Sequence, residues 1–206
     1  MAIARYSPAR ITIGGLRPTA AISQAKHLST GLRRSPPNTR LKPKARCGMS
    51  NVRIRPVESA ADVVTARAMF TEYAASLGID LSFQDFTAEL ASLPGAYAPP
   101  AGALLIAEIN AVAVGCVAVR PLEPPLIAEL KRLYVRPTGR GSGTGLAFTE
   151  AALGIARAIG YARIRLDTLP SMTAARRLYA RLGFREISAY RHNPVPGTAY
   201  MELTLR

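Results

Sequence analysis

The clearest chemical signal in the chain is a glycine-rich turn between a predicted strand, 127–135, and a predicted helix, 143–159. The residues of the turn are Arg140, Gly141, Ser142, Gly143, Thr144 and Gly145. Glycine has no side chain, so a ligand can reach the backbone N–H groups of such a turn directly. Those N–H groups and the positive end of the helix dipole favour an anion such as a phosphate. Because Arg140 adds positive charge, the sequence predicts a phosphate-binding turn.

The spacing of the glycines excludes two familiar phosphate-binding motifs. No Gly-Lys-Ser/Thr follows the turn, so it is not a Walker A loop. The glycines also lack the offsets of the dinucleotide-binding fingerprint, and no acidic residue follows at a suitable strand end. When only this turn is considered, the alternative is a flexible connection that binds no ligand.

A second motif lies in and after a helix predicted over 171–182. It runs from Ala175 to Phe184 as Ala-Arg-Arg-Leu-Tyr-Ala-Arg-Leu-Gly-Phe. The turn resembles the Arg/Gln-x-x-Gly-x-Gly/Ala motif of the GCN5-related N-acetyltransferase (GNAT) superfamily, and the second motif is similar to that family's late helix and Gly-Phe turn. The resemblance covers residues 51–206. It departs from the family at Met172, where many members have an asparagine.

The resemblance implies an acyl-CoA N-acyltransferase fold with acetyl-CoA as co-substrate. The backbone amides of the turn would bind the cofactor, and its pantetheine arm would follow the strand that ends at Val135. The implied reaction moves acetyl, or another short acyl group, to an amine by direct attack in a ternary complex. The sequence shows no well-placed Cys or Ser with an adjacent base, which agrees with a reaction without a covalent acyl-enzyme.

Two residues are candidates for proton transfer. Glu129 lies six residues before Val135, where the histone-acetyltransferase branch of the family has its general base. The alternative is an ion pair with Lys131, which lies two residues on and on the same strand face. Tyr179 matches the tyrosine that protonates the departing thiolate in many members, and its alternative is core packing with a satisfied hydroxyl.

Two further residues are weaker candidates. His192 lies in a loop rich in proline and glycine, Tyr190–Gly197, and we favour a solvated side chain there over a base. Cys116 lies within a predicted strand, where a buried inert thiol is favoured over a nucleophile. No Cys/His spacing is typical of a metal site, so no metal is expected.

Several charged side chains have either a binding or a surface role. One group either binds an acidic acceptor or forms surface ion pairs, and consists of Arg132, Arg165 and Asp167. Another is expected on a solvated helix face, with contact to the cofactor phosphates as the alternative, and consists of Arg176, Arg177 and Arg181.

The hydrophobic pattern predicts a mixed, mostly antiparallel α/β sheet flanked by helices. Helices are expected over 58–77, 83–93, 143–159 and 171–182. Strands are expected over 52–57, 103–108, 112–120, 127–135, 161–167, 185–190 and 198–205. This order of elements matches the one that the GNAT resemblance implies.

Positive charge is concentrated at the start of the chain. The 206 residues include 27 Lys and Arg and 13 Asp and Glu, a formal net charge of +14. Residues 1–48 contain ten of the basic residues and no acidic residue, so the rest has 27 − 10 = 17 basic and 13 acidic side chains. The net charge of the rest is therefore +4, and nucleic acid is not expected as its partner.

We predict that residues 1–48 are a disordered basic extension, because five prolines and one aromatic residue leave little apolar surface to offset ordering entropy. The segment is either a transit peptide or a stretch upstream of a true start at Met49, with a nucleic-acid-binding arm as a third alternative. A cytoplasmic location is expected unless the transit peptide is genuine. No apolar run approaches the roughly 20 residues that cross a bilayer, so no membrane partner is expected.

These observations favour an N-acetyltransferase domain over residues 51–206 that acts on a small-molecule or peptide amine. A homodimer stays open. One alternative is a non-catalytic module that binds or senses acyl-CoA. The other is a nucleic-acid-associated protein that acts through its basic extension.

Overall fold

The structure is a computed structural model, and it describes residues 52–205. The predicted basic extension, 1–48, lies outside the described residues. Within residues 52–205, no helix is both long and apolar enough to cross a membrane.

The described residues form strands and helices close to those predicted. The strands are β1 (Arg53–Pro56), β2 (Ala103–Ile109), β3 (Val112–Leu122), β4 (Ile127–Val135), β5 (Arg163–Thr168), β6 (Arg185–Ile187) and β7 (Ala199–Thr204). The helices are α1 (Ala60–Leu77), α2 (Phe86–Ser92), α3 (Thr144–Ile159) and α4 (Thr173–Arg181), with short 3-10 helices η1 (Ser82–Gln84), η2 (Gly95–Tyr97) and η3 (Pro137–Gly139).

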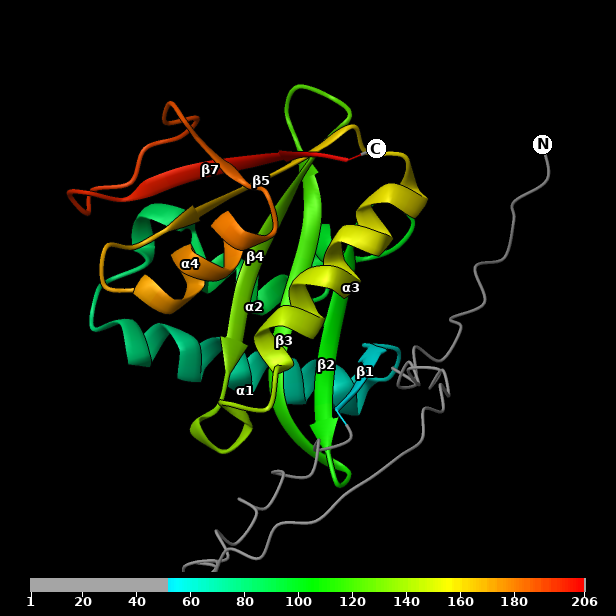
Figure 1. The fold of residues 1–206 in the computed structure, drawn as a ribbon. Coiled ribbons are helices and arrows are strands. Elements are labelled where there is room, and N and C mark those ends of the chain that lie inside the picture. The colour runs from blue at the N-terminus through cyan, green and yellow to red at the C-terminus, as the bar shows by residue number, and fades with distance from the viewer. Residues whose placement is uncertain (1–51, 206) are drawn as a thin grey trace, which may run out of the picture. The chain divides into compact units, whose positions relative to one another are not determined.

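The seven strands of the described part form one sheet in the order β1-β2-β3-β4-β5-β7-β6 (Figure 1). Strands β4 and β5 are parallel neighbours, and the other neighbouring pairs are antiparallel. The predicted fold class, a mixed and mostly antiparallel α/β sheet with flanking helices, is confirmed.

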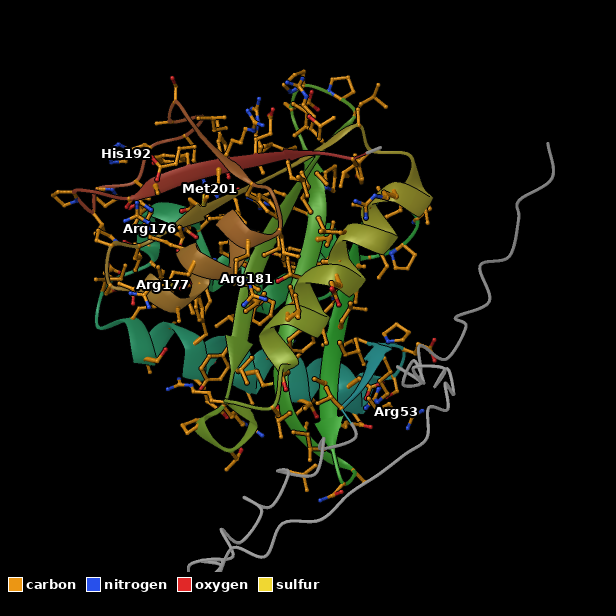
Figure 2. All side chains as sticks on the ribbon, in the orientation of Figure 1. Arg53, Arg176, Arg177, Arg181, His192 and Met201 are labelled. Carbon is orange, nitrogen blue, oxygen red and sulfur yellow. The ribbon has the colours of Figure 1, made fainter. Side chains whose placement is uncertain are left out.

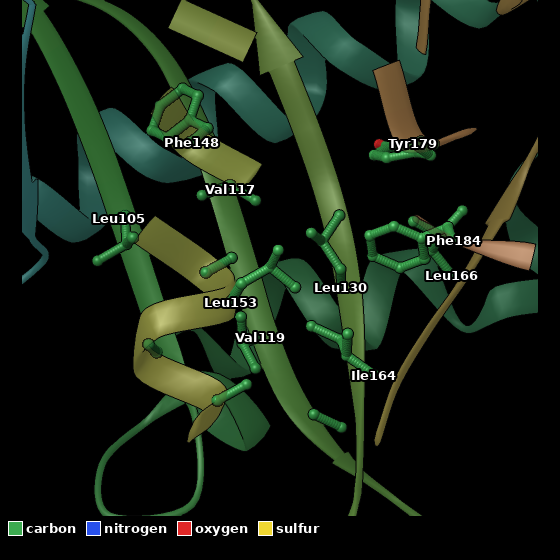
Figure 3. Packing of buried hydrophobic residues seen from close by; sticks show 14 of the residues in the cluster. Leu105, Val117, Val119, Leu130, Phe148, Leu153, Ile164, Leu166, Tyr179 and Phe184 are labelled. Atoms are coloured by element: carbon green, nitrogen blue, oxygen red, sulfur yellow. The ribbon is translucent and has the colours of Figure 1, made fainter. Parts of the chain in front are cut away.

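Two apolar cores cover the two faces of this sheet. Leu105 of β2 belongs to the core that contains Phe148 of α3 and Tyr179 of α4 (Figure 3). Its neighbour Leu104 belongs to the core that contains Phe70 of α1. Successive strand residues point to opposite faces, so α1 packs on one face and α3 and α4 pack on the other.

A β-bulge in the middle of β4 shapes the site. Two residues of β4, Arg132 and Leu133, lie opposite the single residue Val117 of β3. Arg132 has a φ of 55°, a left-handed conformation that costs a non-glycine residue about 1 kcal/mol or more. Its guanidinium pairs with both carboxylate oxygens of Glu89 in α2, which offsets this cost.

Strand β4 separates from β5 after three residue pairs. The parallel pairing joins Ile127–Glu129 of β4 to Arg163–Arg165 of β5 and stops there. Beyond this point β4 stays bonded to β3, and β5 stays bonded to β7. Figure 1 shows the two strands diverging toward α4. The sheet is therefore open between residues 130–135 and 166–168.

Two predicted elements are shorter than expected, and both differences affect the site. The predicted helix 83–93 is divided at Asp85, whose φ of 55° separates η1 from α2. The last residue of η1, Gln84, accepts a hydrogen bond from Lys131 of β4 at 2.8 Å. The predicted strand 185–190 ends at Ile187, and the hydroxyl of Tyr190 in the loop that follows bonds to Glu129 instead.

Candidate active site

A cavity of about 420 Å³ lies at the opening between β4 and β5. Its walls come from both faces of the sheet, with Tyr73 of α1 and Gln84 of η1 on one side and Tyr179 of α4 on the other. Arg140 of the glycine-rich turn also lines it. The cavity is therefore lined by Arg140 of the first motif and by Ala175 and Tyr179 of the second, whereas residues 141–145 are not among its lining residues.

The glycine-rich turn presents backbone N–H groups at the start of α3. Gly143 is the N-cap of this helix, and its oxygen accepts a hydrogen bond from the N–H of Ala147. In the part of the chain that the structure describes, no hydrogen bond engages the N–H groups of residues 141–146. These consecutive donors, with the positive end of the helix dipole, form an anion site.

The conformation of the turn accounts for its residue types. Gly141 and Gly143 have φ values of 78° and 83°, in the left-handed region that favours glycine. The hydroxyls of Ser142 and Thr144 donate to the backbone oxygen of Gly139 at 2.6 and 3.2 Å. The side chains thus brace the turn from within and leave its N–H groups available to a ligand.

Val135 and Arg140 lie at the two ends of the connection from β4 to the turn. Val135 is the last residue of β4 and pairs with Gly115 of β3. The guanidinium Nε of Arg140 donates to the backbone oxygen of Val135 at 3.1 Å. Arg140 therefore ties the turn to the end of β4, and of these two predicted cofactor contacts only Arg140 lines the cavity.

Tyr179 of α4 lines the cavity. Its ring packs against Phe184, with 5.5 Å between ring centroids, and the residue is 5% exposed (Figure 3). Among the described residues its hydroxyl forms no hydrogen bond, and the ring belongs to the core that contains Phe148, so the acid and the core-packing interpretation both stay open. Burial raises the pKa of Tyr179, which keeps the hydroxyl protonated at neutral pH. Such a group can serve as a general acid.

Glu129 is held in an ion-pair network. It is 0% exposed and is not among the residues that line the cavity. Arg120 Nε donates to one carboxylate oxygen at 2.8 Å, while Arg191 and the hydroxyl of Tyr190 donate to the other. Its ion pairs are therefore with Arg120 and Arg191, and among the described residues the alternative pair with Lys131 does not form. A role for Glu129 as general base stays a prediction, which this geometry does not favour.

Asp167 and Lys131 face the cavity from the two separated strands. The Asp167 carboxylate accepts hydrogen bonds from Arg191 at 2.7 Å and from Asn193 at 3.0 Å. Burial acts to raise the pKa of Asp167, but the charges of Lys131 and Arg191 and these hydrogen bonds lower it overall. Asp167 is therefore an ionised, largely buried partner of Arg191, with a side chain that is 9% exposed.

Arg191 does not line the cavity, but it holds the cavity-lining Asp167, and sequence reasoning missed it. Its guanidinium joins Glu129 of β4 to Asp167 of β5, across the point where the strands separate. Arg191 and Glu129 lie 62 positions apart, and no local pattern in the Pro/Gly-rich loop signals their contact. The ion-pair cluster lies at the end of the opening where β4 and β5 are still paired, and consists of Arg120, Glu129, Arg191 and Asp167.

Arg132 and Arg165 are engaged inside the fold. Arg132 lies over the ring of Phe86 at 5.0 Å and pairs with Glu89. Arg165 Nε pairs with Glu202 of β7 at 2.7 Å. Neither guanidinium is an isolated cation available to bind an acidic acceptor.

The remaining candidates lie at the surface (Figure 2). His192 is exposed and is not among the cavity-lining residues, in agreement with a solvated side chain. Arg177 and Arg181 of α4 are exposed as well. Arg176 pairs with Glu186 at 3.1 Å. The prediction of a solvated face on this helix is therefore confirmed.

Cys116 has the properties of an inert thiol. It is 0% exposed, and its sulfur donates to the backbone oxygen of Arg132 at 3.5 Å. Burial raises the pKa of Cys116 well above its usual range, which removes the reactive thiolate at neutral pH. In residues 52–205, no group of three or more His, Cys, Asp or Glu side chains is arranged to hold a metal ion.

The sequence that forms most of these elements matches a known family. The Acetyltransferase (GNAT) family matches residues 67–184, which is more than half of the chain. The chain belongs to the GNAT family. The resemblance carried by the turn and by the motif at α4 is thereby confirmed.

The chain is also similar to individual proteins. An uncharacterized N-acetyltransferase of Schizosaccharomyces pombe is 38% identical over 157 residues, which are 76% of this chain and 96% of the relative. The human N-acetylaspartate synthetase is 34% identical over 99 residues, which are 48% of this chain and 33% of that protein. A solved PaiA N-acetyltransferase from Thermoplasma acidophilum, in complex with coenzyme A, is similar with a TM-score of 0.56 and 19% identity, over 74% of this chain and 98% of that one.

The residues of this GNAT site fit coenzyme A. Its pyrophosphate requires hydrogen-bond donors and positive charge, which the N–H groups of residues 141–146 and Arg140 supply. The cavity extends from Arg140, at the start of the turn, to Tyr179. At the family's asparagine position, the Met172 sulfur accepts from the Thr168 hydroxyl at 3.7 Å, so a thioether stands where an amide is usual.

Proposed function

We propose that residues 51–206 form an acetyl-CoA-dependent N-acetyltransferase that moves an acetyl group to a primary amine by direct attack. The observation that carries the proposal is the cavity through the sheet, which is lined by Tyr179 and by Arg140, the residue just before the unengaged N–H groups of residues 141–146. A cofactor and an acceptor can enter such a cavity from opposite faces of the sheet and meet between β4 and β5.

The two ends of the cavity suit different ligands. Arg140 and the residues around the start of α4, such as Ser171 and Thr173, are polar and suit the cofactor. The end formed by α1 and the segment after it is mostly apolar, and consists of Tyr73, Leu77, Ile79, Leu81 and Phe83. This end suits an acceptor whose amine is attached to an apolar or aromatic body.

The reaction needs an uncharged amine, a held thioester and a proton for the leaving sulfur. The turn anchors the cofactor through its phosphates, which fixes the thioester in the opening. The lone pair of the acceptor nitrogen attacks the carbonyl carbon, the C–S bond breaks, and Tyr179 protonates the departing thiolate. The acceptor nitrogen releases a proton, so the products are an N-acetylated amine and coenzyme A.

The geometry favours direct transfer over a covalent enzyme intermediate. Cys116 is the only cysteine of the described residues, and its thiol is buried and bonded to a backbone oxygen. A thiol that cannot ionise or reach the cavity cannot accept the acyl group.

A thiol-release assay on the full chain tests this function. The chain is incubated with acetyl-CoA and one of a panel of primary amines at a time, and the release of coenzyme A is followed for each amine. The panel includes aromatic and aliphatic amines, because of the apolar acceptor end, and L-aspartate, because of the similarity to N-acetylaspartate synthetase. We expect at least one amine to give saturable thiol release and an acetylated product. Saturable binding of acetyl-CoA with no turnover across the panel would instead support a non-catalytic acyl-CoA-binding module.

A further inference from the structure

Lys131 is an unusual residue for this chain. It is the only lysine after Lys44, and every other basic side chain from residue 49 onward is an arginine. This lysine does not extend from the surface, since it is only 5% exposed and lines the cavity between β4 and β5. A buried primary amine therefore lies in the space where an acceptor amine must react.

The hydrogen bonding of Lys131 leaves the amine available. Its Nζ donates to the neutral side-chain oxygen of Gln84 at 2.8 Å. Among the described residues no carboxylate forms an ion pair with it, because the nearby acidic groups are paired with arginines. Burial without an ionic partner disfavours a charged ammonium group.

The charges around Lys131 act in opposite directions. Burial lowers the pKa of Lys131 to about 7, and this is the largest influence. Glu129 on the same strand and Asp167 on β5 act to raise the pKa, while Arg132 and Arg191 act to lower it. Glu89 of α2 also faces this amine, since Lys131 lowers the pKa of that carboxyl group. A large fraction of Lys131 is therefore uncharged and nucleophilic near neutral pH.

We infer that Lys131 is itself acetylated by acetyl-CoA bound in the cavity when no acceptor occupies it. This rests on the proposed function, because the thioester must lie in the opening between β4 and β5. The Lys131 nitrogen forms a bond to the thioester carbonyl carbon, and the C–S bond breaks with its electron pair going to sulfur. The nitrogen loses one proton and the sulfur gains one, so the products are N-acetyl-lysine and coenzyme A.

Acetylation at this position blocks the acceptor end of the cavity. The product amide keeps one N–H group that can still donate to Gln84, but it adds an acetyl group to the space that an acceptor would use. An amide is a much weaker acyl donor than a thioester, so the group stays in place. The chain thereby inactivates itself when acetyl-CoA is present and the acceptor is scarce.

The inference is tested by mass spectrometry of the full chain after incubation in the absence of an acceptor. The chain is incubated with acetyl-CoA and digested with a glutamate-specific protease, which releases the peptide 130–150 with Lys131 as its only lysine. We expect one acetyl group on this peptide, with a rate that saturates as acetyl-CoA increases. The rate should rise about tenfold from pH 6 to pH 8, as the uncharged amine becomes dominant.

Two controls separate the inference from its alternatives. Lys26, Lys42 and Lys44 report uncatalysed acetylation in the same digest and should react about 100-fold more slowly than Lys131. The variant Lys131→Arg has no amine that can be acetylated, so its peptide 130–150 should stay unmodified while Lys26, Lys42 and Lys44 react as in the wild type.

Three further outcomes would overturn the inference, and one of them would overturn the proposed function as well. Saturable acetyl-CoA binding with an unmodified Lys131 would overturn the inference and leave the proposed function standing. Acetylation of Lys131 that persists in a variant unable to bind acetyl-CoA would overturn it as well, because the reaction would then come from solution. If the wild-type chain does not bind acetyl-CoA, the proposed function fails and the inference fails with it.

Discussion

Strand β4 consists of a paired half, with a neighbouring strand on each side, and an open half, with a neighbouring strand on one side only. The first half, Ile127–Glu129, is hydrogen-bonded to β3 on one side and to β5 on the other. The second half, residues 130–135, keeps β3 and loses β5. Glu129 in the first half is buried and forms ion pairs with two arginines, whereas Lys131, two residues later, faces a cavity.

The difference shows that backbone pairing decides which polar side chains are available for chemistry. Where both neighbouring strands are present, a charged side chain can be buried only with ionic partners, and Arg120 and Arg191 supply them to Glu129. Where one neighbour is missing, side chains meet a cavity, and backbone groups gain room for a ligand. The paired half should therefore govern stability, and the open half should govern binding and rate.

The largest effect is expected from Glu129→Gln in the paired half. The amide cannot neutralise Arg120 and Arg191, so we expect the free energy of unfolding to fall by about 3 kcal/mol. Urea denaturation measures the change. The matched control is Glu186→Gln, whose side chain is 68% exposed in its pair with Arg176 and should cost less than about 0.5 kcal/mol. Unchanged stability with abolished acetyl transfer would instead make Glu129 the general base.

A smaller effect, on rate alone, is expected from Tyr179→Phe, in the cavity that the open half of β4 also lines. Loss of the hydroxyl removes the proton donor for the thiolate, and we expect kcat to fall about 100-fold. The affinity for acetyl-CoA and the melting temperature should not change. Thiol release with an acceptor from the amine panel measures the rate, and Tyr161→Phe, whose hydroxyl bonds to Ala101 away from the cavity, is the control. Equal rates for Tyr179→Phe and wild type would exclude the tyrosine as the acid.

The smallest effect is expected from Ser142→Ala, in the turn that follows the open half. The hydroxyl of Ser142 braces the turn through Gly139, and losing this hydrogen bond is worth about 1 kcal/mol, or roughly fivefold in the Kd for acetyl-CoA. Isothermal titration calorimetry measures it, with the exposed Ser188→Ala as control. A Kd equal to that of wild type would show that the turn is held without this brace.

The sequence predicts the features of this site that depend on local backbone chemistry. The turn could be predicted because left-handed residues at Gly141 and Gly143 and a helix start are encoded within a few positions. Most strand and helix bounds follow from hydrophobic patterns for the same reason. Tyr179 could be proposed through the family motif that contains it.

The partners across the opening could not be predicted, because they come from distant segments. Gln84 lies 47 positions from Lys131, and Arg191 lies 62 positions from Glu129. The bulge was also hidden, since Arg132 adopts a left-handed φ that its residue type does not signal. The alternative that pairs Glu129 with Lys131 missed Arg191 and Gln84 for the same reason, since each comes from a segment far away in the sequence.

The most direct test of the account is whether the turn after the open half of β4 binds the phosphates of acetyl-CoA. Calorimetry compares the wild-type chain with Gly143→Glu, which places a carboxylate at the anion site, and with Gly143→Ala, which tests the effect of the left-handed φ without a charge. Gly154→Glu adds the same charge to the exposed side of the same helix and serves as the control.

We expect wild type and Gly154→Glu to bind acetyl-CoA with equal affinity. Gly143→Glu should bind at least about 100-fold more weakly, because its charge repels the phosphates. Gly143→Ala should lie between them, and circular dichroism should show that all four chains are folded. Equal affinity in Gly143→Glu and wild type would contradict the account, because the N–H groups of the turn would then not be the cofactor site.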